Sequence, residues 1–117
     1  MILTPDKDGV ITVSFLLVPE YAMMALLSAI EPMRVANRLA EKELFRWQLL
    51  AQDDQEVLAS NGLALHKTQS IEDVPSPTNL FVCSSFQPEN YINDDVVNWL
   101  KKIKRRGAVI GAIDTGC

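Results

Sequence analysis

The stretch Gly107-Ala108-Val109-Ile110-Gly111-Ala112-Ile113-Asp114-Thr115-Gly116-Cys117 decides the fold class of this chain. Small and β-branched residues run from Ala108 to Ile113 without a charge, which is typical of a strand buried on both faces. A polar residue and a glycine follow, so the strand is expected to run into a sharp turn. Ligands of open α/β sheets bind outside the carboxyl ends of the strands, and the side chain that this turn displays is Asp114.

Three further segments, at residues 10–18, 46–51 and 80–83, predict strands: the first and third are apolar runs, and the second (RWQLLA) follows a charged connection. Between the second and the third run, Asn61-Gly62 separates two short apolar pieces, which predicts a hairpin within residues 56–66. Residues 70–78 contain two prolines and are expected to form a loop.

Two amphipathic patterns predict helices. The first runs from Ala22 to about Ala40, and Pro32 is expected to kink it into two segments, because proline removes one helical hydrogen bond. The second has Asn93 as its N-cap, acidic residues in its first turn, basic residues in its last turn and Gly107 as its stop. Basic residues at a carboxyl end match the helix dipole, so they indicate a solvated helix end rather than a nucleic-acid surface.

The order strand, helix, strand, hairpin, strand, helix, strand predicts an α/β fold with a mostly parallel sheet flanked by helices. Residues 1–9 are expected to be a loose N-terminal tail, and residues 10–117 the first part of a domain that is cut off at the turn. The net charge of −4 argues against nucleic-acid binding by this segment alone. The sequence shows no bilayer-spanning tract and no secretory signal, so the cytoplasm is the expected location, and no cofactor or metal is expected.

The turn Ala112-Ile113-Asp114-Thr115-Gly116 resembles the nucleophile elbow of the ThiJ/PfpI class I glutamine amidotransferase-like superfamily, whose fold is flavodoxin-like. In that superfamily a cysteine stands where this chain has Asp114. A carboxylate cannot replace a thiolate nucleophile without changing the reaction, so the resemblance implies that the cysteine chemistry is lost. Cys117 falls one turn beyond the corner, where it is expected to pack rather than to react.

Three other positions depart from the superfamily enzymes. Their glutamate early in the first helix falls near Ala25, and their glycine pair after the third strand corresponds to Ser85 and Phe86. The histidine that follows the cysteine in the protease-like members corresponds to Thr115. The resemblance therefore implies a pocket suited to binding, and a chain that is not an enzyme.

A longer set of motifs resembles the amino-terminal domain of the GlxA-type branch of AraC-family transcription regulators. These motifs are Pro19-Glu20-Tyr21-Ala22-Met23-Met24, Ala29-Ile30-Glu31-Pro32-Met33-Arg34-Val35-Ala36-Asn37, Arg46-Trp47-Gln48-Leu49, Ser60-Asn61-Gly62 and Ile113-Asp114-Thr115-Gly116. In that branch the domain senses a small metabolite and dimerises, while two carboxyl-terminal helix-turn-helix units bind DNA. The similarity is to the group that controls catabolism of glycine betaine, carnitine and related amines. It implies a homodimer with a small amine or amino-acid-like effector, and DNA binding only through units outside this sequence.

The candidate ligand-binding residues follow the predicted strands at their carboxyl ends. They are Asp114, Thr115, Ser84, Ser85, Phe86, Glu20 and Tyr21. A carboxylate with aromatic neighbours can hold an ammonium or quaternary amine by charge and cation–π attraction. The alternative role of Asp114 is to cap the next helix, and the two roles are compatible. The lone histidine, His66, is expected to be a surface or packing residue at the hairpin.

Three function classes stay open at this point. The favoured one is the effector-sensing and dimerising domain of a bacterial transcription regulator, without catalytic activity. A second is a ThiJ/PfpI-type hydrolase or glyoxalase-like enzyme, which the missing cysteine argues against. A third is a dimerisation module with a vestigial pocket.

Overall fold

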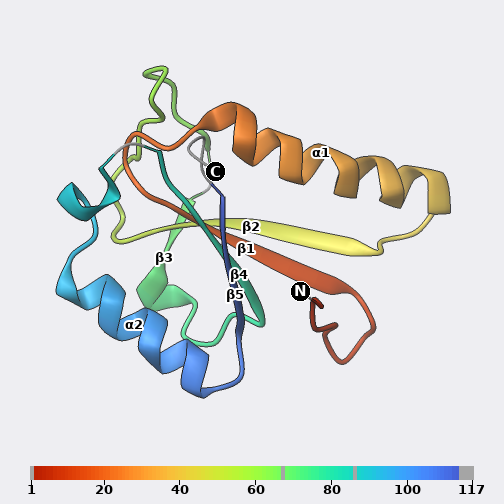
Figure 1. Ribbon diagram of the computed structural model, residues 1–117. Coiled ribbons are helices and arrows are strands. Elements are labelled where there is room, and N and C mark those ends of the chain that lie inside the picture. Colours follow the sequence, from red (N-terminus) through yellow and green to blue (C-terminus); the bar gives the residue numbers. More distant parts are fainter. Residues whose placement is uncertain (1, 67, 86, 114–117) are drawn as a thin grey trace.

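The computed structural model describes residues 2–66, 68–85 and 87–113 (Figure 1). Within them, five parallel strands form one sheet in the order β3-β2-β1-β4-β5. The strands are β1 Ile11–Leu17, β2 Phe45–Ala51, β3 Thr68–Ser70, β4 Asn79–Cys83 and β5 Val109–Ile113. The helices are α1 Met23–Ala40 and α2 Asp94–Arg105, with short 3₁₀ turns η1 Ile71–Asp73 and η2 Pro88–Asn90. The predicted α/β fold with a parallel sheet is confirmed.

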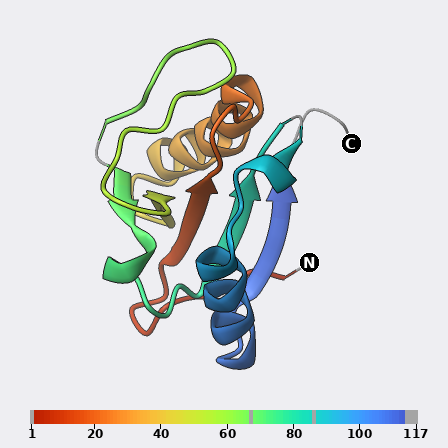
Figure 2. The same ribbon diagram turned by 90° about the vertical axis from the view of Figure 1, so that its left-hand side faces the viewer.

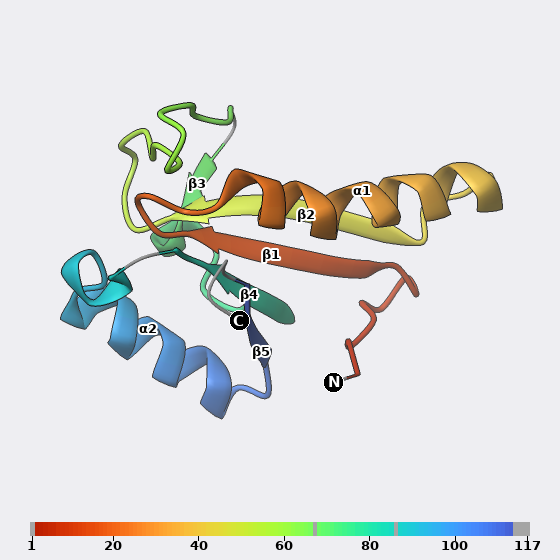
Figure 3. The same cartoon turned by 45° about the horizontal axis from the view of Figure 1, so that its top comes forward.

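The two α-helices cover opposite faces of the sheet (Figures 1 and 3). On one face, Val13 and Phe15 of β1 belong to the same buried cluster as Leu26 of α1. On the other face, Leu16 shares a buried cluster with Trp99 of α2. Successive side chains of a strand point to opposite faces, so burial on both sides gives β1 its continuous apolar run.

The winding of the chain reverses between β1 and β4. From β1 the chain passes through α1 to β2 and β3 on one side, and from β4 it passes through α2 to β5 on the other. Right-handed crossovers in opposite directions place the two helices on opposite faces. The carboxyl ends of β1, β4 and β5 point the same way (Figure 2), and there the Val18 amide donates to the Cys83 carbonyl at 3.0 Å. This edge beside β1 and β4 is the topological switch point, where ligands of such sheets bind.

Helix α2 begins and ends where its sequence predicts. Asn93 accepts a hydrogen bond from the Val96 amide at 3.0 Å, and Asp94 and Asp95 occupy the first turn. Gly107 follows the helix at φ +92°, a left-handed conformation that favours glycine. The predicted capping signals are confirmed.

Helix α1 is continuous, so the expected division at Pro32 is wrong. Proline lacks the N–H that would bind the carbonyl of Ser28, one turn earlier. Both Ser28 and Pro32 lie on the solvent-exposed side of the helix, where water can bind the freed carbonyl.

The predicted hairpin at residues 56–66 is also wrong. The turn itself forms, since the Gly62 amide donates to the Ala59 carbonyl at 2.9 Å, but no strand flanks it. Across the turn the Ala59 amide donates to the Leu63 carbonyl at 2.8 Å, and on its other side Ala59 makes a parallel bridge with Tyr21, so the segment forms a turn beside the end of β1 without extending into two strands. Strand β3 and η1 were not predicted, and they lie partly in the expected loop.

Strand β5 lies at an edge of the described sheet, where β4 is its only described neighbour. Ala112 is exposed and the other residues of the strand are half-buried. The expected burial of this strand on both faces is therefore not found in the described residues.

Two asparagines fix the amino-terminal edge of the sheet. Buried Asn79 accepts from the Thr4 amide at 2.7 Å and donates to the carbonyls of Thr4 and Thr12 at 2.8 and 2.9 Å. Asn37 of α1 accepts from the Leu44 and Phe45 amides at 2.8 and 2.9 Å. The segment before β1, expected to be loose, is thus tied to the sheet.

We predict that Asn79→Ala lowers the free energy of unfolding by about 2–4 kcal/mol, because three backbone groups of Thr4 and Thr12 lose their partner and two of its own polar atoms leave the core. Urea denaturation followed by circular dichroism measures the change. Asn90→Ala is the matched control: its side chain is exposed and bonds only to Gln87 among the described side-chain contacts, so a change below about 0.5 kcal/mol is expected. Equal effects of the two substitutions would contradict the role assigned to Asn79.

Candidate functional site

The predicted site residues that the structure describes gather at the carboxyl edge of the sheet. Glu20 and Tyr21 follow β1, and Ser84 and Ser85 follow β4, the adjacent strand. Three further candidates, Asp114, Thr115 and Phe86, lie outside the described residues, as does Cys117.

The segment after β1 is held in an unusual backbone conformation. Glu20 has φ +71°, which is left-handed and uncommon for a residue with a side chain. Its amide donates to the Leu58 carbonyl at 2.9 Å, and the Ser60 amide donates to the Tyr21 carbonyl at 2.9 Å. The loop of residues 58–63 therefore fixes this segment, leaving the Glu20 side chain exposed at the rim and turning Tyr21 inward. Such strained residues persist only where surrounding contacts hold them, and they cluster at functional sites.

Tyr21 places a polar atom in the core without a hydrogen bond. The side chain is fully buried, and its hydroxyl has no hydrogen-bond partner among the described residues. Burial raises the pKa of the phenol, and the nearby Cys83 adds to the shift. An unpaired buried hydroxyl costs about 1–3 kcal/mol, so it is a feature that a binding role would explain.

Cys83, at the end of β4, is a buried free thiol. Burial raises its pKa to about 12, so the thiol stays protonated at neutral pH. Only a thiolate is a nucleophile, and this cysteine is therefore chemically inert in the folded chain. Ser84, the next residue, is buried too, and its amide donates to the Ile113 carbonyl at 3.0 Å. This bond brings the predicted site residue Ser84 beside the last described residue before Asp114.

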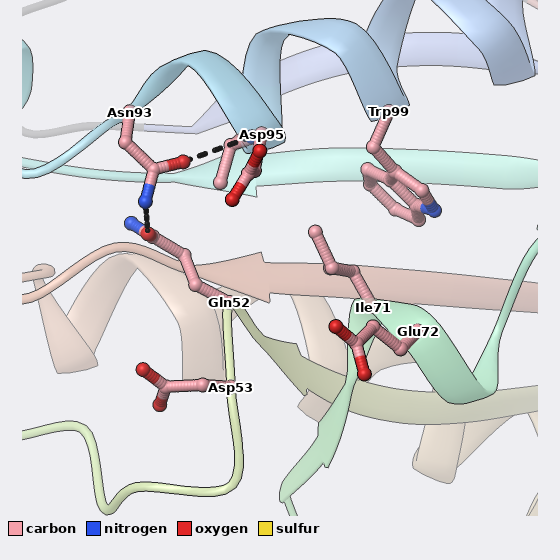
Figure 4. Close-up of a pocket in the computed structure, with 8 residues that line it drawn as sticks. Gln52, Asp53, Ile71, Glu72, Asn93, Asp95 and Trp99 are labelled. Atoms are coloured by element: carbon pink, nitrogen blue, oxygen red, sulfur yellow. Dashed lines mark hydrogen bonds between the residues drawn. The ribbon is translucent and has the colours of Figure 1, made fainter.

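A crevice opens further along the same edge, between the end of β2 and the start of α2 (Figure 4). It has a volume of about 430 Å³ and is lined by Gln52, Asp53, Ile71, Glu72, Asn93, Asp95, Val96 and Trp99. Figure 4 shows Asp95 pointing from α2 toward the segment that carries Glu72, with Asp53 on the loop after β2. Three carboxylates and an indole thus surround one space.

Gln52 forms the wall between this crevice and a second one. Its side-chain oxygen accepts from Asn93 at 2.8 Å, and its side-chain nitrogen donates to the Tyr91 carbonyl. The second crevice, of about 290 Å³, adjoins the end of β1 and also contains Asp53 together with Glu56. The carboxyl edge therefore carries two adjoining acidic crevices beside the switch point.

Sequence reasoning missed these crevices. The sequence explains Asp95 as an acidic residue in the first turn of α2, where it matches the helix dipole, and it places Glu72 in an expected loop. Neither pattern indicates that the two carboxylates line one crevice. Only Asp53 carried a usable signal, because it comes directly after a predicted strand. No group of three or more His, Cys, Asp or Glu side chains that could hold a metal ion occurs in the described part of the chain.

The predicted role of His66 as a surface residue agrees with the structure, where it is exposed on the loop before β3. The described residues contain no helix with the length and hydrophobicity to cross a membrane.

Comparisons with known proteins agree with this architecture. The chain is 41% identical over 102 residues to the HTH-type transcriptional regulator CdhR of Pseudomonas aeruginosa. This match covers 87% of this chain and 30% of CdhR. It is 32% identical over 112 residues to the HTH-type transcriptional regulator GbdR of the same species, and this match covers 96% of this chain and 30% of GbdR. It is also 32% identical over 117 residues to the HTH-type transcriptional regulator GlxA of Rhizobium meliloti, and this match covers 99% of this chain and 36% of GlxA. This chain is a relative of the GlxA-type HTH transcriptional regulators. No protein-family model matches it.

Solved structures confirm the fold of this GlxA-type chain. An AraC-family transcriptional regulator from Pseudomonas putida superposes with a TM-score of 0.70 at 22% identity, covering 86% of this chain and 54% of that one. A DJ-1 superfamily protein from Agrobacterium tumefaciens superposes with a TM-score of 0.60 at 14% identity, and the match covers 86% of this chain and 52% of that protein. The predicted ThiJ/DJ-1-type, flavodoxin-like fold is confirmed. The GlxA-type chain spans about a third of the length of the curated relatives that it matches.

We predict that Tyr21→Phe leaves the unfolding free energy of the ligand-free chain unchanged or raises it by up to about 1 kcal/mol, because it removes a hydroxyl that has no described partner. Chemical denaturation measures the effect. Tyr91→Phe, at a more exposed tyrosine, serves as the control. A loss of more than about 1 kcal/mol for Tyr21→Phe alone would mean that the hydroxyl is bonded after all.

Cys83 gives a pH-dependent prediction. In a Cys117→Ser background, iodoacetamide should leave Cys83 unlabelled from pH 7 to pH 10, because the folded thiol ionises only near pH 12. Mass spectrometry detects the label, and the same chain in urea should react readily. Rapid labelling of the folded chain at pH 8 would contradict a protonated, buried thiol.

Proposed function

We propose that this chain is the effector-sensing and dimerising part of a bacterial AraC-family transcription regulator, that it acts in the cytoplasm, and that it has no catalytic activity. DNA binding is assigned to helix-turn-helix units outside this sequence. The relatives at 41% and 32% identity are named HTH-type transcriptional regulators, which supports the regulator class.

The chemistry of the switch-point edge is the observation that carries the proposal. The described thiol at this edge, Cys83, is held protonated, and the only histidine of the chain, His66, is exposed on a loop. Covalent catalysis needs an activated nucleophile, most often one with a base within hydrogen-bond reach or a lowered pKa, and the pKa of Cys83 is raised instead. The superfamily's cysteine position holds Asp114 here, so the edge offers carboxylates in place of a thiolate.

Carboxylates favour a cationic effector. Asp53, Glu72 and Asp95 line one crevice and Glu56 the adjoining one, while no Lys or Arg is among the lining residues of either. A half-enclosed site screens charge less than bulk water does. The electrostatic attraction between an ammonium group and several neighbouring carboxylates is therefore stronger there than in open solvent. The Trp99 indole in the same wall can add a cation–π contact. These features support a small amine or amino-acid-like effector, and the proposal of Asp114 as its anchor rests on the resemblance of residues 112–116 to the superfamily's elbow.

The effector is sensed at a segment that has two distinctive features. Glu20 is held in a left-handed conformation by Leu58, and Tyr21 carries an unpaired hydroxyl. A ligand that supplies a partner to this hydroxyl or relaxes this backbone binds one conformation better than another, which is what a conformational response requires. The sensing residues assigned here are Asp114, Thr115, Glu20, Tyr21, Ser84, Ser85 and Phe86.

A thermal-shift screen of amines, amino acids and betaines tests the proposal. A ligand at one hundred times its dissociation constant stabilises the folded chain by about 2.7 kcal/mol, which raises the melting temperature of a domain of this size by about 10 °C. We predict that at least one ammonium compound produces such a shift and that Asp114→Ala abolishes it. Asp54→Asn, an exposed carboxylate outside both crevices, should leave the shift unchanged.

A shift that survives Asp114→Ala but disappears in Asp95→Asn would move the effector from the switch point to the crevice of Figure 4. No shift with any compound would contradict the sensing role and leave a dimerisation module. Turnover of a ThiJ/PfpI-type substrate that Asp114→Ala abolishes would contradict the non-catalytic assignment.

A further inference from the structure

The segment between β2 and β3 contains a chemically labile step, Asn61-Gly62 (Figure 1). It is the one place in the sequence where an asparagine precedes a glycine, since every other asparagine precedes a larger residue. Glycine has no side chain, so its backbone nitrogen can approach the side chain of the asparagine before it. Both residues are exposed. The step is therefore open to deamidation, the spontaneous loss of the asparagine amide.

Deamidation at this step needs only solvent. The Gly62 backbone nitrogen loses its proton to base and attacks the side-chain carbonyl carbon of Asn61. A new carbon–nitrogen bond closes a succinimide ring, the bond to the side-chain nitrogen breaks, and that nitrogen takes up a proton and leaves as ammonia. Water then opens the ring at either of its two carbonyls. The product is aspartate or isoaspartate.

The folded turn holds the reacting groups in hydrogen bonds. The Gly62 amide donates to the Ala59 carbonyl at 2.9 Å, so the proton that must leave is bound. The Asn61 side-chain oxygen accepts from the Leu63 amide at 2.9 Å, and its side-chain nitrogen contacts the Met23 sulfur at 3.6 Å. Gly62 has φ +83°, a left-handed conformation, so the turn favours the same glycine that makes the step labile. The closed turn is therefore expected to resist deamidation.

Contacts with the segment after β1 keep the turn closed. Ala59 makes a parallel bridge with Tyr21, and the Ser60 amide donates to the Tyr21 carbonyl at 2.9 Å. The Glu20 amide donates to the Leu58 carbonyl at 2.9 Å. Because these bonds join the turn to the segment that carries buried Tyr21, opening the turn and releasing this segment are coupled.

We propose that Asn61 is a modification site, converted to aspartate and isoaspartate by deamidation, and that only the opened turn reacts. Isoaspartate routes the main chain through the former side chain and lengthens it by a carbon atom. The hydrogen bond between Gly62 and Ala59 then cannot re-form in its original geometry, so the modified turn holds Tyr21 less tightly. This inference goes beyond the proposed function and does not rest on it.

Incubation of the chain in mildly alkaline buffer, with and without urea, tests the proposal. Peptide mapping by mass spectrometry follows the conversion of amide to acid, and isoaspartyl methyltransferase detects isoaspartate. In urea, Asn61 should convert about tenfold faster or more than Asn90, the exposed control that precedes Tyr91. In the folded chain, Asn61 should convert at least about tenfold more slowly than in urea, because the bonds of the turn must break first.

Hydrogen exchange measures the opening of the turn independently. Exchange and deamidation both require base to remove the same Gly62 proton after its bond to Ala59 has broken. The factor by which folding slows exchange of the Gly62 amide should therefore match, within about an order of magnitude, the factor by which folding slows deamidation. In the purified isoaspartate form, the Ser60 amide should exchange faster than in the unmodified chain, because its bond to Tyr21 is weakened.

Two substitutions of Ser60 separate the contact with Tyr21 from the local sequence. Ser60→Pro removes the amide that donates to Tyr21, so deamidation of the folded chain should become about three- to tenfold faster, with the rate in urea unchanged. Ser60→Ala is the matched control: it keeps this amide and changes only an exposed side chain, so both rates should stay the same. Circular dichroism confirms that each variant is folded.

Any one of four results would overturn the proposal. They are conversion of Asn61 in urea no faster than that of Asn90, equal rates at Asn61 with and without urea, a folded-chain rate that departs from the exchange of the Gly62 amide, and an isoaspartate form in which the Ser60 amide exchanges no faster. If Ser60→Pro does not fold, the comparison of exchange with deamidation on the unsubstituted chain still decides.

Discussion

The parallel pairing of β1 with β4 is the constraint on which the structure depends. β1 is hydrogen-bonded to β2 on one side and to β4 on the other, so the chain must wind in opposite directions from it. That reversal places α1 and α2 on opposite faces and leaves a switch point at the carboxyl edge. The bond from the Val18 amide to the Cys83 carbonyl holds the two strand ends together there. The proposed site is a consequence of this topology rather than of any single motif.

The two edges of the sheet differ in how well their polar groups are satisfied. At the amino-terminal edge, Asn79 and Asn37 bind backbone groups of three separate segments. At the carboxyl-terminal edge, Glu20 has a left-handed backbone and the Tyr21 hydroxyl has no described partner. The well-bonded amino-terminal edge and the strained carboxyl-terminal edge are consistent with the sensing role proposed for the carboxyl-terminal edge.

The sequence predicts the central elements well because their signals are local and consistent. Apolar runs identify β1, β4 and β5, the segment 46–51 after a charged connection identifies β2, and the cap at Asn93 with Gly107 beyond the end identifies α2. The failures have tertiary causes. β3 is a three-residue polar strand, the turn at Ala59 bridges to Tyr21 and has no flanking strands, and Pro32 lies on the exposed side of one continuous helix.

The candidate site was predicted in part. The topology brings Glu20 and Tyr21 to the same edge as Ser84 and Ser85, as the rule for open α/β sheets requires. The crevice of Figure 4 could not be predicted, because Asp53, Glu72 and Asp95 come from three separate segments that only the fold brings together. Binding at the carboxyl edge is tested by titrating the ¹⁵N-labelled chain with glycine betaine, carnitine and ethanolamine while amide chemical shifts are followed. We predict that the amides of Glu20, Tyr21 and Ser84 shift with at least one compound. Shifts confined to residues away from the carboxyl edge, or no shifts at all, would contradict a ligand site there.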